Sequence, residues 1–137
     1  MIFDGIGDLN WLAVVVASLA WFVYSAIYYS VPPISKAWAR AAKIPEQQGA
    51  PLVPIMVATF VLYLIISTVI GLLVAHTGAH DIADGIALGV ALGVAFGAAS
   101  SLIEQMYEQK GSSYWLINGI NSIVSYSIVA SILAVWD

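Results

Sequence analysis

The residues best suited to bind a metal ion stand in a short segment between two strongly apolar stretches. Four candidate ligands fall within nine residues: His76, His80, Asp81 and Asp84. Imidazole and carboxylate groups are common ligands of zinc and related divalent ions. Asp81 is equally well placed to cap a following helix, and Asp84 would lie in its first turn, where the helix dipole favours an anion. Because Gly78 interrupts the segment between the two histidines, we favour the capping role and expect no metal.

Uncharged polar residues form a second group of candidate functional residues. They lie at helical spacing in the apolar stretches 52–75 and 114–136, and the candidates for a polar interior or a pore are Tyr63, Ser67, Asn118, Asn121, Ser122 and Ser125. Polar groups inside a bilayer must find partners within the protein, so both stripes should face inward. We favour hydrogen bonds between helices as their role. The alternative is a polar cavity that passes water or a small neutral solute.

Groups that could perform catalysis are scarce. Glu104 and Glu108 stand one helical turn apart, but two like charges at that spacing indicate a hydrated helix end rather than a proton-transfer pair. The sequence has no cysteine, no nucleophile paired with a base, and no phosphate-binding or cofactor motif. We therefore expect neither enzymatic activity nor a cofactor.

The composition identifies the solvent that surrounds most of these residues. Of the 137 residues, 61% are hydrophobic and only 9% are charged, whereas soluble domains carry about a quarter charged residues. Stretches without Asp, Glu, Lys or Arg cover residues 9–30, 52–75, 85–102 and 114–136, each near the ~20 residues that a helix needs to cross a bilayer. The pattern predicts an all-α, polytopic membrane protein, a single four-transmembrane-helix bundle. The net charge of −4 argues against nucleic acid as a partner.

The basic residues predict how the bundle is oriented. Lys36, Arg40 and Lys43 lie between the first and second apolar stretches, and Lys110 lies between the third and fourth. Lys and Arg concentrate in the cytoplasmic loops of membrane proteins. We therefore expect both termini on the non-cytoplasmic side.

The connection between the first two stretches has the pattern of a short interfacial amphipathic helix at residues 35–43. Pro32 and Pro33 should end the first transmembrane helix, and Ser35 can cap the next helix. The residues expected to anchor it combine one aromatic ring with three positive charges: Trp38, Lys36, Arg40 and Lys43. Such a helix lies on the membrane with its basic face toward anionic lipid, so membrane lipid is an expected partner.

Small residues repeat at every fourth position of the third apolar stretch. They form a row of glycines (Gly85, Gly89, Gly93 and Gly97) and a row of alanines (Ala87, Ala91, Ala95 and Ala99). The offset of two residues puts the rows on nearly opposite faces of a helix, and small residues let membrane helices approach closely. We expect this glycine zipper to be packed on both sides, either at the centre of the bundle or against a second copy.

These patterns favour one function and leave a second open. The favoured function is a non-enzymatic packing protein, either a homo-oligomer or an accessory subunit of a larger membrane complex, held through the third helix. The alternative is a small channel or transporter lined by polar residues of the second and fourth helices.

Short motifs spread over nearly the whole chain resemble a bacterial family, the domain of unknown function 1761. They are Asn10-Trp11-Leu12-Ala13-Val14, Tyr28-Tyr29-Ser30, Lys36-Ala37-Trp38, the glycine-rich third stretch with its acidic end, and Trp115-Leu116-Ile117-Asn118-Gly119. The chain departs from the family pattern at Ser25, at Tyr28 and at the Pro32-Pro33 corner. The resemblance implies a four-helix protein of a bacterial inner membrane. It implies no activity, substrate or catalytic residue.

Overall fold

The computed structural model describes residues 2–42 and 52–136 of the chain. Four helices in these ranges are long and apolar enough to cross a membrane, which confirms the predicted all-α, multi-pass fold. They are α1 (Trp11–Ser30), α3 (Leu52–Thr77), the consecutive segments α4 (Ile82–Leu92), η2 (Gly93–Ala98) and α5 (Ala99–Glu108), and α6 (Ser112–Val135). We call the continuous helix from α4 to α5 the third span. Two short helices, η1 (Ile6–Asp8) and α2 (Pro32–Ala42), flank α1, and the described residues contain no strand.

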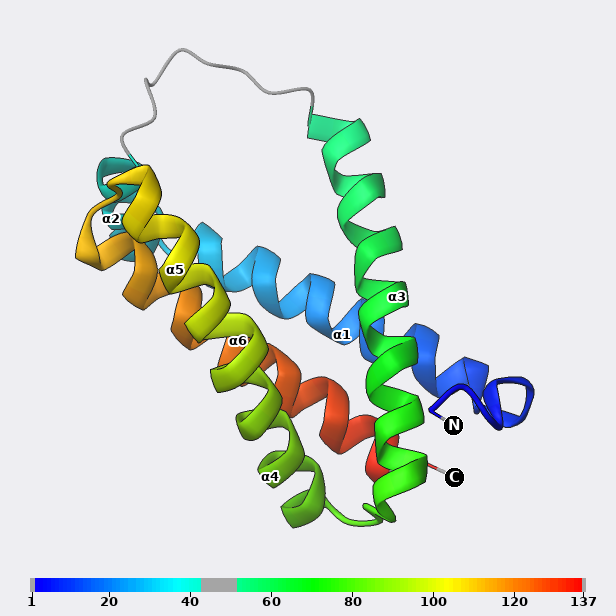
Figure 1. Cartoon of the computed structure of the whole chain (residues 1–137). Coiled ribbons are helices and arrows are strands. Elements are labelled where there is room, and N and C mark those ends of the chain that lie inside the picture. Colours follow the sequence, from blue (N-terminus) through cyan, green and yellow to red (C-terminus); the bar gives the residue numbers. More distant parts are fainter. Residues whose placement is uncertain (1, 43–51, 137) are drawn as a thin grey trace.

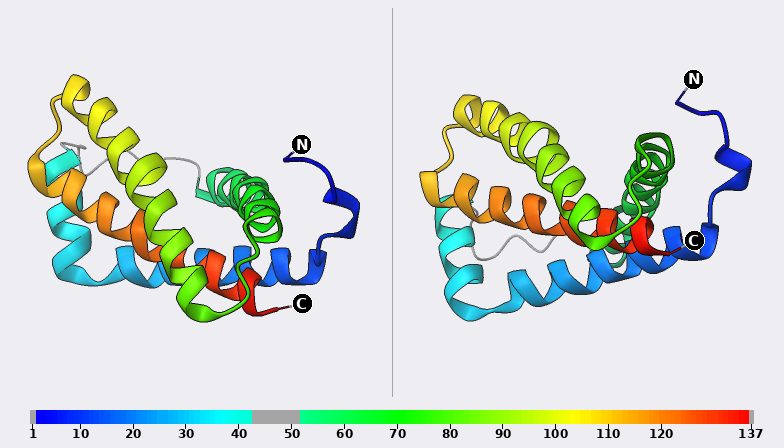
Figure 2. Two further views of the ribbon diagram at one scale, coloured as in Figure 1. Left: turned by 60° about the horizontal axis from the view of Figure 1, so that its bottom comes forward. Right: turned by 90° about the horizontal axis from the view of Figure 1, so that it is seen from below.

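Helix α6 lies at the centre of the bundle (Figure 1, Figure 2). It contacts α1, α2, α3 and all three segments of the third span. Both termini and the α3–α4 connection lie at one end of the molecule, which we call the terminal end (Figure 1). Helix α2 and the α5–α6 connection lie at the other, which we call the basic end because it carries Lys36, Arg40 and Lys110. Of the two positions expected for the third span, the central one thus belongs to α6.

A buried core forms where α1, α3 and α6 meet. Its residues are Ala13, Val14, Ala17 and Trp21 from α1, Ile70 and Val74 from α3, and Val129, Ala130, Leu133 and Ala134 from α6. The Trp21 ring stacks on Tyr63 with centroids 3.9 Å apart and meets the edge of Tyr126 at 5.4 Å. Many large apolar side chains outside this core are exposed, as expected for helices whose outer surface contacts lipid.

The glycine row of the third span packs directly on the α6 backbone. A β-carbon added at Gly85 would lie 2.5 Å from the Ser131 Cα, and one at Gly93 would lie 2.7 Å from the Ile123 Cα. Gly85, Gly89, Gly93 and Gly97 are all buried, whereas Ala87, Ala91, Ala95 and Ala99 on the opposite side are all exposed. Among the described residues, the glycine row is therefore buried and the alanine row is not.

A π-helical segment, η2, keeps the glycine row on α6. A four-residue repeat advances by about 40° per step around an α-helix, so four glycines in a straight α-helix would drift away from one contact line. In η2 the Ala99 N–H donates to the Val94 carbonyl, five residues earlier. Such a wider turn reverses part of the drift, and Gly93, Gly97 and Ala98 all remain buried.

Helix α2 begins earlier than predicted. Val31 is extended and separates it from α1, but Pro32 and Pro33 are the first residues of α2 instead of lying before it. Proline suits the first turn of a helix because its fixed φ is helical and its missing N–H would have no partner there. Ser35 consequently lies inside the helix, where its hydroxyl donates to the Pro32 carbonyl at 3.2 Å.

The structure places three of the four predicted anchor residues. Lys36 and Arg40 are exposed, and Trp38 is half-buried against the bundle. Lys43 lies outside the described residues. Helix α2 is held at the basic end by the Gly111 N–H, which donates to the Ala41 carbonyl at 3.1 Å.

Replacing Gly89 with alanine should destabilise the protein, although alanine is the better helix former, because the new β-carbon would overlap the Ser127 backbone. Overpacking of this kind costs about 1–3 kcal/mol, so the midpoint of thermal unfolding in detergent, followed by circular dichroism, should fall. Gly7→Ala is the matched control, since a β-carbon there meets no atom within 4 Å. Equal midpoints for the two variants would contradict the close contact between the third span and α6.

Candidate functional site

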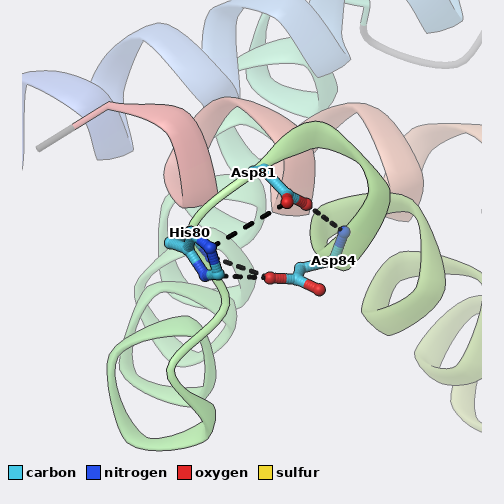
Figure 3. A group of neighbouring side chains, drawn as sticks. All are labelled: His80, Asp81 and Asp84. Atoms are coloured by element: carbon cyan, nitrogen blue, oxygen red, sulfur yellow. Dashed lines mark hydrogen bonds and ion pairs between the residues drawn. The ribbon is translucent and has the colours of Figure 1, made fainter.

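Three of the four candidate metal ligands come together at the start of α4 (Figure 3). The Asp81 Oδ1 accepts the Asp84 N–H at 2.8 Å, so Asp81 is the N-cap of the helix. The Asp84 Oδ2 lies 3.1 Å from the His80 Nδ1 and accepts the His80 backbone N–H at 3.2 Å. His76 does not join them, because its Nε2 lies 3.1 Å from the Asp4 carbonyl oxygen.

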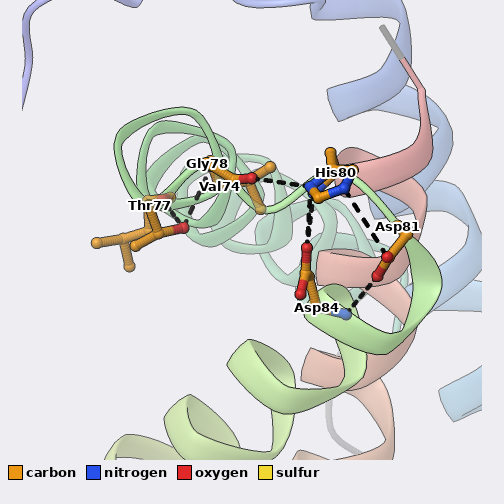
Figure 4. Close-up of polar contacts among 7 residues, drawn as sticks. Val74, Thr77, Gly78, His80, Asp81 and Asp84 are labelled. Carbon is orange, nitrogen blue, oxygen red and sulfur yellow. Dashed lines mark hydrogen bonds and ion pairs between the residues drawn. The ribbon is translucent and has the colours of Figure 1, made fainter.

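The same groups complete the turn between α3 and α4 (Figure 4). Gly78 takes a left-handed φ of 74° after the last residue of α3, a conformation that glycine adopts at little cost. Its carbonyl oxygen lies 3.2 Å from the His80 Nδ1. One ligand atom each from His80, Asp81 and Asp84 fall within 4.8 Å of one another, which is compatible with an open metal site. A metal ion would, however, compete with the helix cap for the same exposed oxygens.

The polar stripe of α6 faces α1. The Asn121 Oδ1 accepts hydrogen bonds from Ser25 at 3.4 Å and from Ser125 at 3.5 Å, and all three side chains are buried. Nearer the basic end, the Tyr29 hydroxyl donates to the Asn118 Oδ1 at 2.5 Å. The spacing of a polar stripe predicts the helix face that it occupies but gives no information about the helix opposite. The sequence therefore does not predict these hydrogen-bond partners on α1.

The remaining polar candidates have separate surroundings. Ser122 lies against Gly97, and Tyr63 stacks on Trp21. Ser67 is fully buried, and its hydroxyl has no hydrogen-bond partner among the described residues. The predicted polar residues of α3 and α6 therefore do not form one continuous hydrogen-bonded line in the described structure.

A pocket opens at the basic end, where residues of α1, α2, α5 and α6 line it. We call this space of about 650 Å³ the aromatic cavity, and it is lined by Tyr29, Ser35, Trp38, Ala39, Ser101, Glu104, Gln105, Tyr114 and Asn118. The Trp38 ring lies between Tyr29, 6.2 Å away, and Tyr114, 5.7 Å away. A second cavity of about 400 Å³ opens at the terminal end between α1, α3 and α6, with Asn10, Gly71 and Leu133 on its wall.

Replacing Asp81 with alanine should lower the stability of the protein by about 1 kcal/mol, because α4 loses its N-cap. Asp81→Asn should preserve the unfolding midpoint, since asparagine caps a helix as well as aspartate does. Both variants remove the carboxylate, so a metal site would respond equally to both. If zinc stabilised the unmodified protein but not the Asp81→Asn variant, the purely capping role of Asp81 would be contradicted.

Comparison with known proteins extends the similarity over the whole bundle. A family model described as "Protein of unknown function (DUF1761)" matches residues 12–134, a range that includes nearly all of the four long helices. No curated protein and no solved structure matches the chain. The chain belongs to this family of proteins of unknown function, DUF1761.

Proposed function

We propose that this protein is a non-enzymatic subunit of a bacterial inner membrane that associates with a second copy through the alanine face of its third span. The orientation proposed is the one with the basic end in the cytoplasm, because Lys36, Arg40 and Lys110 lie there. The acidic residues Asp81 and Asp84 lie at the opposite, terminal end. Both termini would then be non-cytoplasmic.

The observation that carries the proposal is the contrast between this face and the other outer surfaces. Ala87, Ala91, Ala95 and Ala99 are exposed. Large apolar side chains are exposed on other helices, such as Leu12 on α1 and Leu62 on α3, which are 63% and 56% exposed. Lipid chains are as apolar as leucine, so helices associate in a bilayer where small residues allow close backbone contact. The alanine face has this property, and none of its four alanines is buried by the described residues.

The other partner compatible with this face is a helix of a larger membrane complex. The same small residues would allow close packing against such a helix. Symmetric pairing is favoured because a two-fold contact requires one self-complementary surface and no further component. Purification in mild detergent distinguishes the two, since a homodimer contains this chain alone.

Single cysteines on the alanine face should form disulfide-linked dimers in native membranes. The chain has no cysteine of its own, so each variant carries one thiol. Ala91→Cys and Ala95→Cys should cross-link on mild oxidation because a disulfide needs Cα atoms within about 7 Å. Leu62→Cys, exposed on α3, is the control and should remain monomeric on a non-reducing gel.

A bulky residue on the same face tests the contact without a cross-link. Ala91→Leu should shift the protein from dimer to monomer in size-exclusion chromatography with light scattering, while its helix content is unchanged. Dimers that persist in Ala91→Leu, or equal cross-linking at residues 62 and 91, would refute pairing through the alanine face.

A second candidate function is the passage of a small neutral solute. Its support is the pair of cavities at opposite ends of the α1–α6 contact, with the buried polar side chains of Ser25, Asn121 and Ser125 between them. These side chains are closely packed and bonded to one another. Passage would therefore require α1 to move relative to α6.

Under this second function, Asn121→Ala should lower the flux of a solute such as glycerol into proteoliposomes severalfold. Ser113→Ala, on the exposed first turn of α6, is the control. Because Asn121 is remote from the alanine face, cysteine cross-linking at Ala91 should be the same in both variants. Equal flux in the two variants, or flux no faster than through empty vesicles, would count against passage.

A further inference from the structure

We propose that the aromatic cavity at the basic end binds a small organic ammonium group, such as the one carried by ethanolamine. The proposal concerns a different part of the molecule from the alanine face and does not depend on pairing between copies. The volume of the aromatic cavity, about 650 Å³, falls in the range of small-molecule sites, roughly 300–1,000 Å³. The volume therefore suits an ammonium attached to a larger group better than a bare metal ion.

The aromatic side chains supply the first part of the recognition. Tyr29, Trp38 and Tyr114 all line the cavity, and the Trp38 ring centroid lies 6.2 Å from that of Tyr29 and 5.7 Å from that of Tyr114. The face of an aromatic ring attracts a cation within about 6 Å, and several rings around one space are the usual receptor for organic ammonium groups. The Lys110 Nζ lies 6.0 Å from the Tyr114 centroid, so this ring already has a cation at the limit of the attractive range.

Oxygen atoms supply the second part. Glu104 contributes the one carboxylate on the wall of the cavity, and no Lys or Arg is among the described residues that line it. Gln105 is only 8% exposed, and its Oε1 has no hydrogen-bond partner among the described residues. Buried acceptors are nearly always satisfied, so this oxygen indicates a missing donor. Rotation of the Gln105 side-chain amide would present it to the N–H groups of a ligand.

The charge of the residues that line the cavity favours a cation over an anion as the ligand. An anion would meet the Glu104 carboxylate and the electron-rich ring faces, and both interactions would be repulsive. The Tyr29 hydroxyl donates to Asn118 within the cavity, so it is already used. A cation with N–H donors instead gains attraction from the rings and hydrogen bonds from the carboxylate and the amide.

The position of the cavity makes both a lipid headgroup and a free amine possible sources of the ammonium. Ser35, Trp38 and Ala39 of α2 line the cavity, and short amphipathic helices of this kind lie at the depth of lipid headgroups. A phosphatidylethanolamine headgroup would reach the cavity from the side, and a soluble amine would reach it from the aqueous phase. The chemistry that recognises the ammonium is the same for both.

The test uses the full-length protein purified in detergent and titrated with three compounds. These are dihexanoyl phosphatidylethanolamine, dihexanoyl phosphatidylglycerol and free ethanolamine. Tryptophan fluorescence is the readout, and loss of the response in Trp38→Tyr assigns it to the cavity. We expect saturable binding of phosphatidylethanolamine and no matching response to phosphatidylglycerol. Saturation by free ethanolamine at similar concentrations would identify a soluble amine as sufficient, whereas binding of the lipid alone would identify the headgroup in its membrane context.

Two matched charge changes then test the geometry. Glu104→Gln should weaken binding about tenfold because it removes a charge-assisted contact. Glu108→Gln, one turn further along α5 and outside the cavity wall, makes the same change of net charge and should leave affinity unaltered. Both side chains are exposed, so unfolding midpoints should remain equal. Equal weakening by both substitutions, equal binding of the two lipids, or no saturable response to any compound would overturn the proposal.

Discussion

The arrangement of the bundle depends on the close backbone contact between the glycine face of the third span and α6. In lipid there is no hydrophobic force that presses helices together, so van der Waals contact and hydrogen bonds must hold them. The glycines allow the α6 backbone to approach to distances that a β-carbon would forbid. Because α6 also contacts α1, α2 and α3, the third span supports the helix against which all the others pack.

The other face of α6 is held by a different interaction. Asn121 accepts hydrogen bonds from α1 and from its own helix, and the fully buried Ser125 belongs to the same group. Each such bond contributes only about 0.6 kcal/mol in a membrane protein, yet an unsatisfied amide in hydrocarbon would cost several times more. Polar pairing therefore selects one register between α1 and α6, as the glycines select one between α6 and the third span.

The sequence predicts the helices well and their neighbours poorly, for a physical reason. Bilayer thickness sets helix length, so uncharged stretches such as 52–75 reveal a span directly. Helical spacing then shows which residues share a face, but two smooth faces give no basis for deciding which one meets α6. The hydrogen bond between Tyr29 and Asn118 was likewise not predictable, since a tyrosine near the end of a transmembrane helix can belong to an interfacial aromatic belt or to a packing contact. The start of α2 at Pro32 was missed because proline both ends and begins helices.

The third span has three different structural roles along its length. Its glycine face packs on α6, its alanine face is exposed, and its last turns in α5 place Glu104 and Gln105 on the wall of the aromatic cavity. The π-helical η2 lies between the alanine-rich α4 and this cavity wall. Gly85 and Gly89 of α4 and Gly93 and Gly97 of η2 all pack on α6, where a β-carbon at any of them would lie within 2.7 Å of an α6 atom. The glycine contact with α6 therefore ends where the cavity-lining α5 begins.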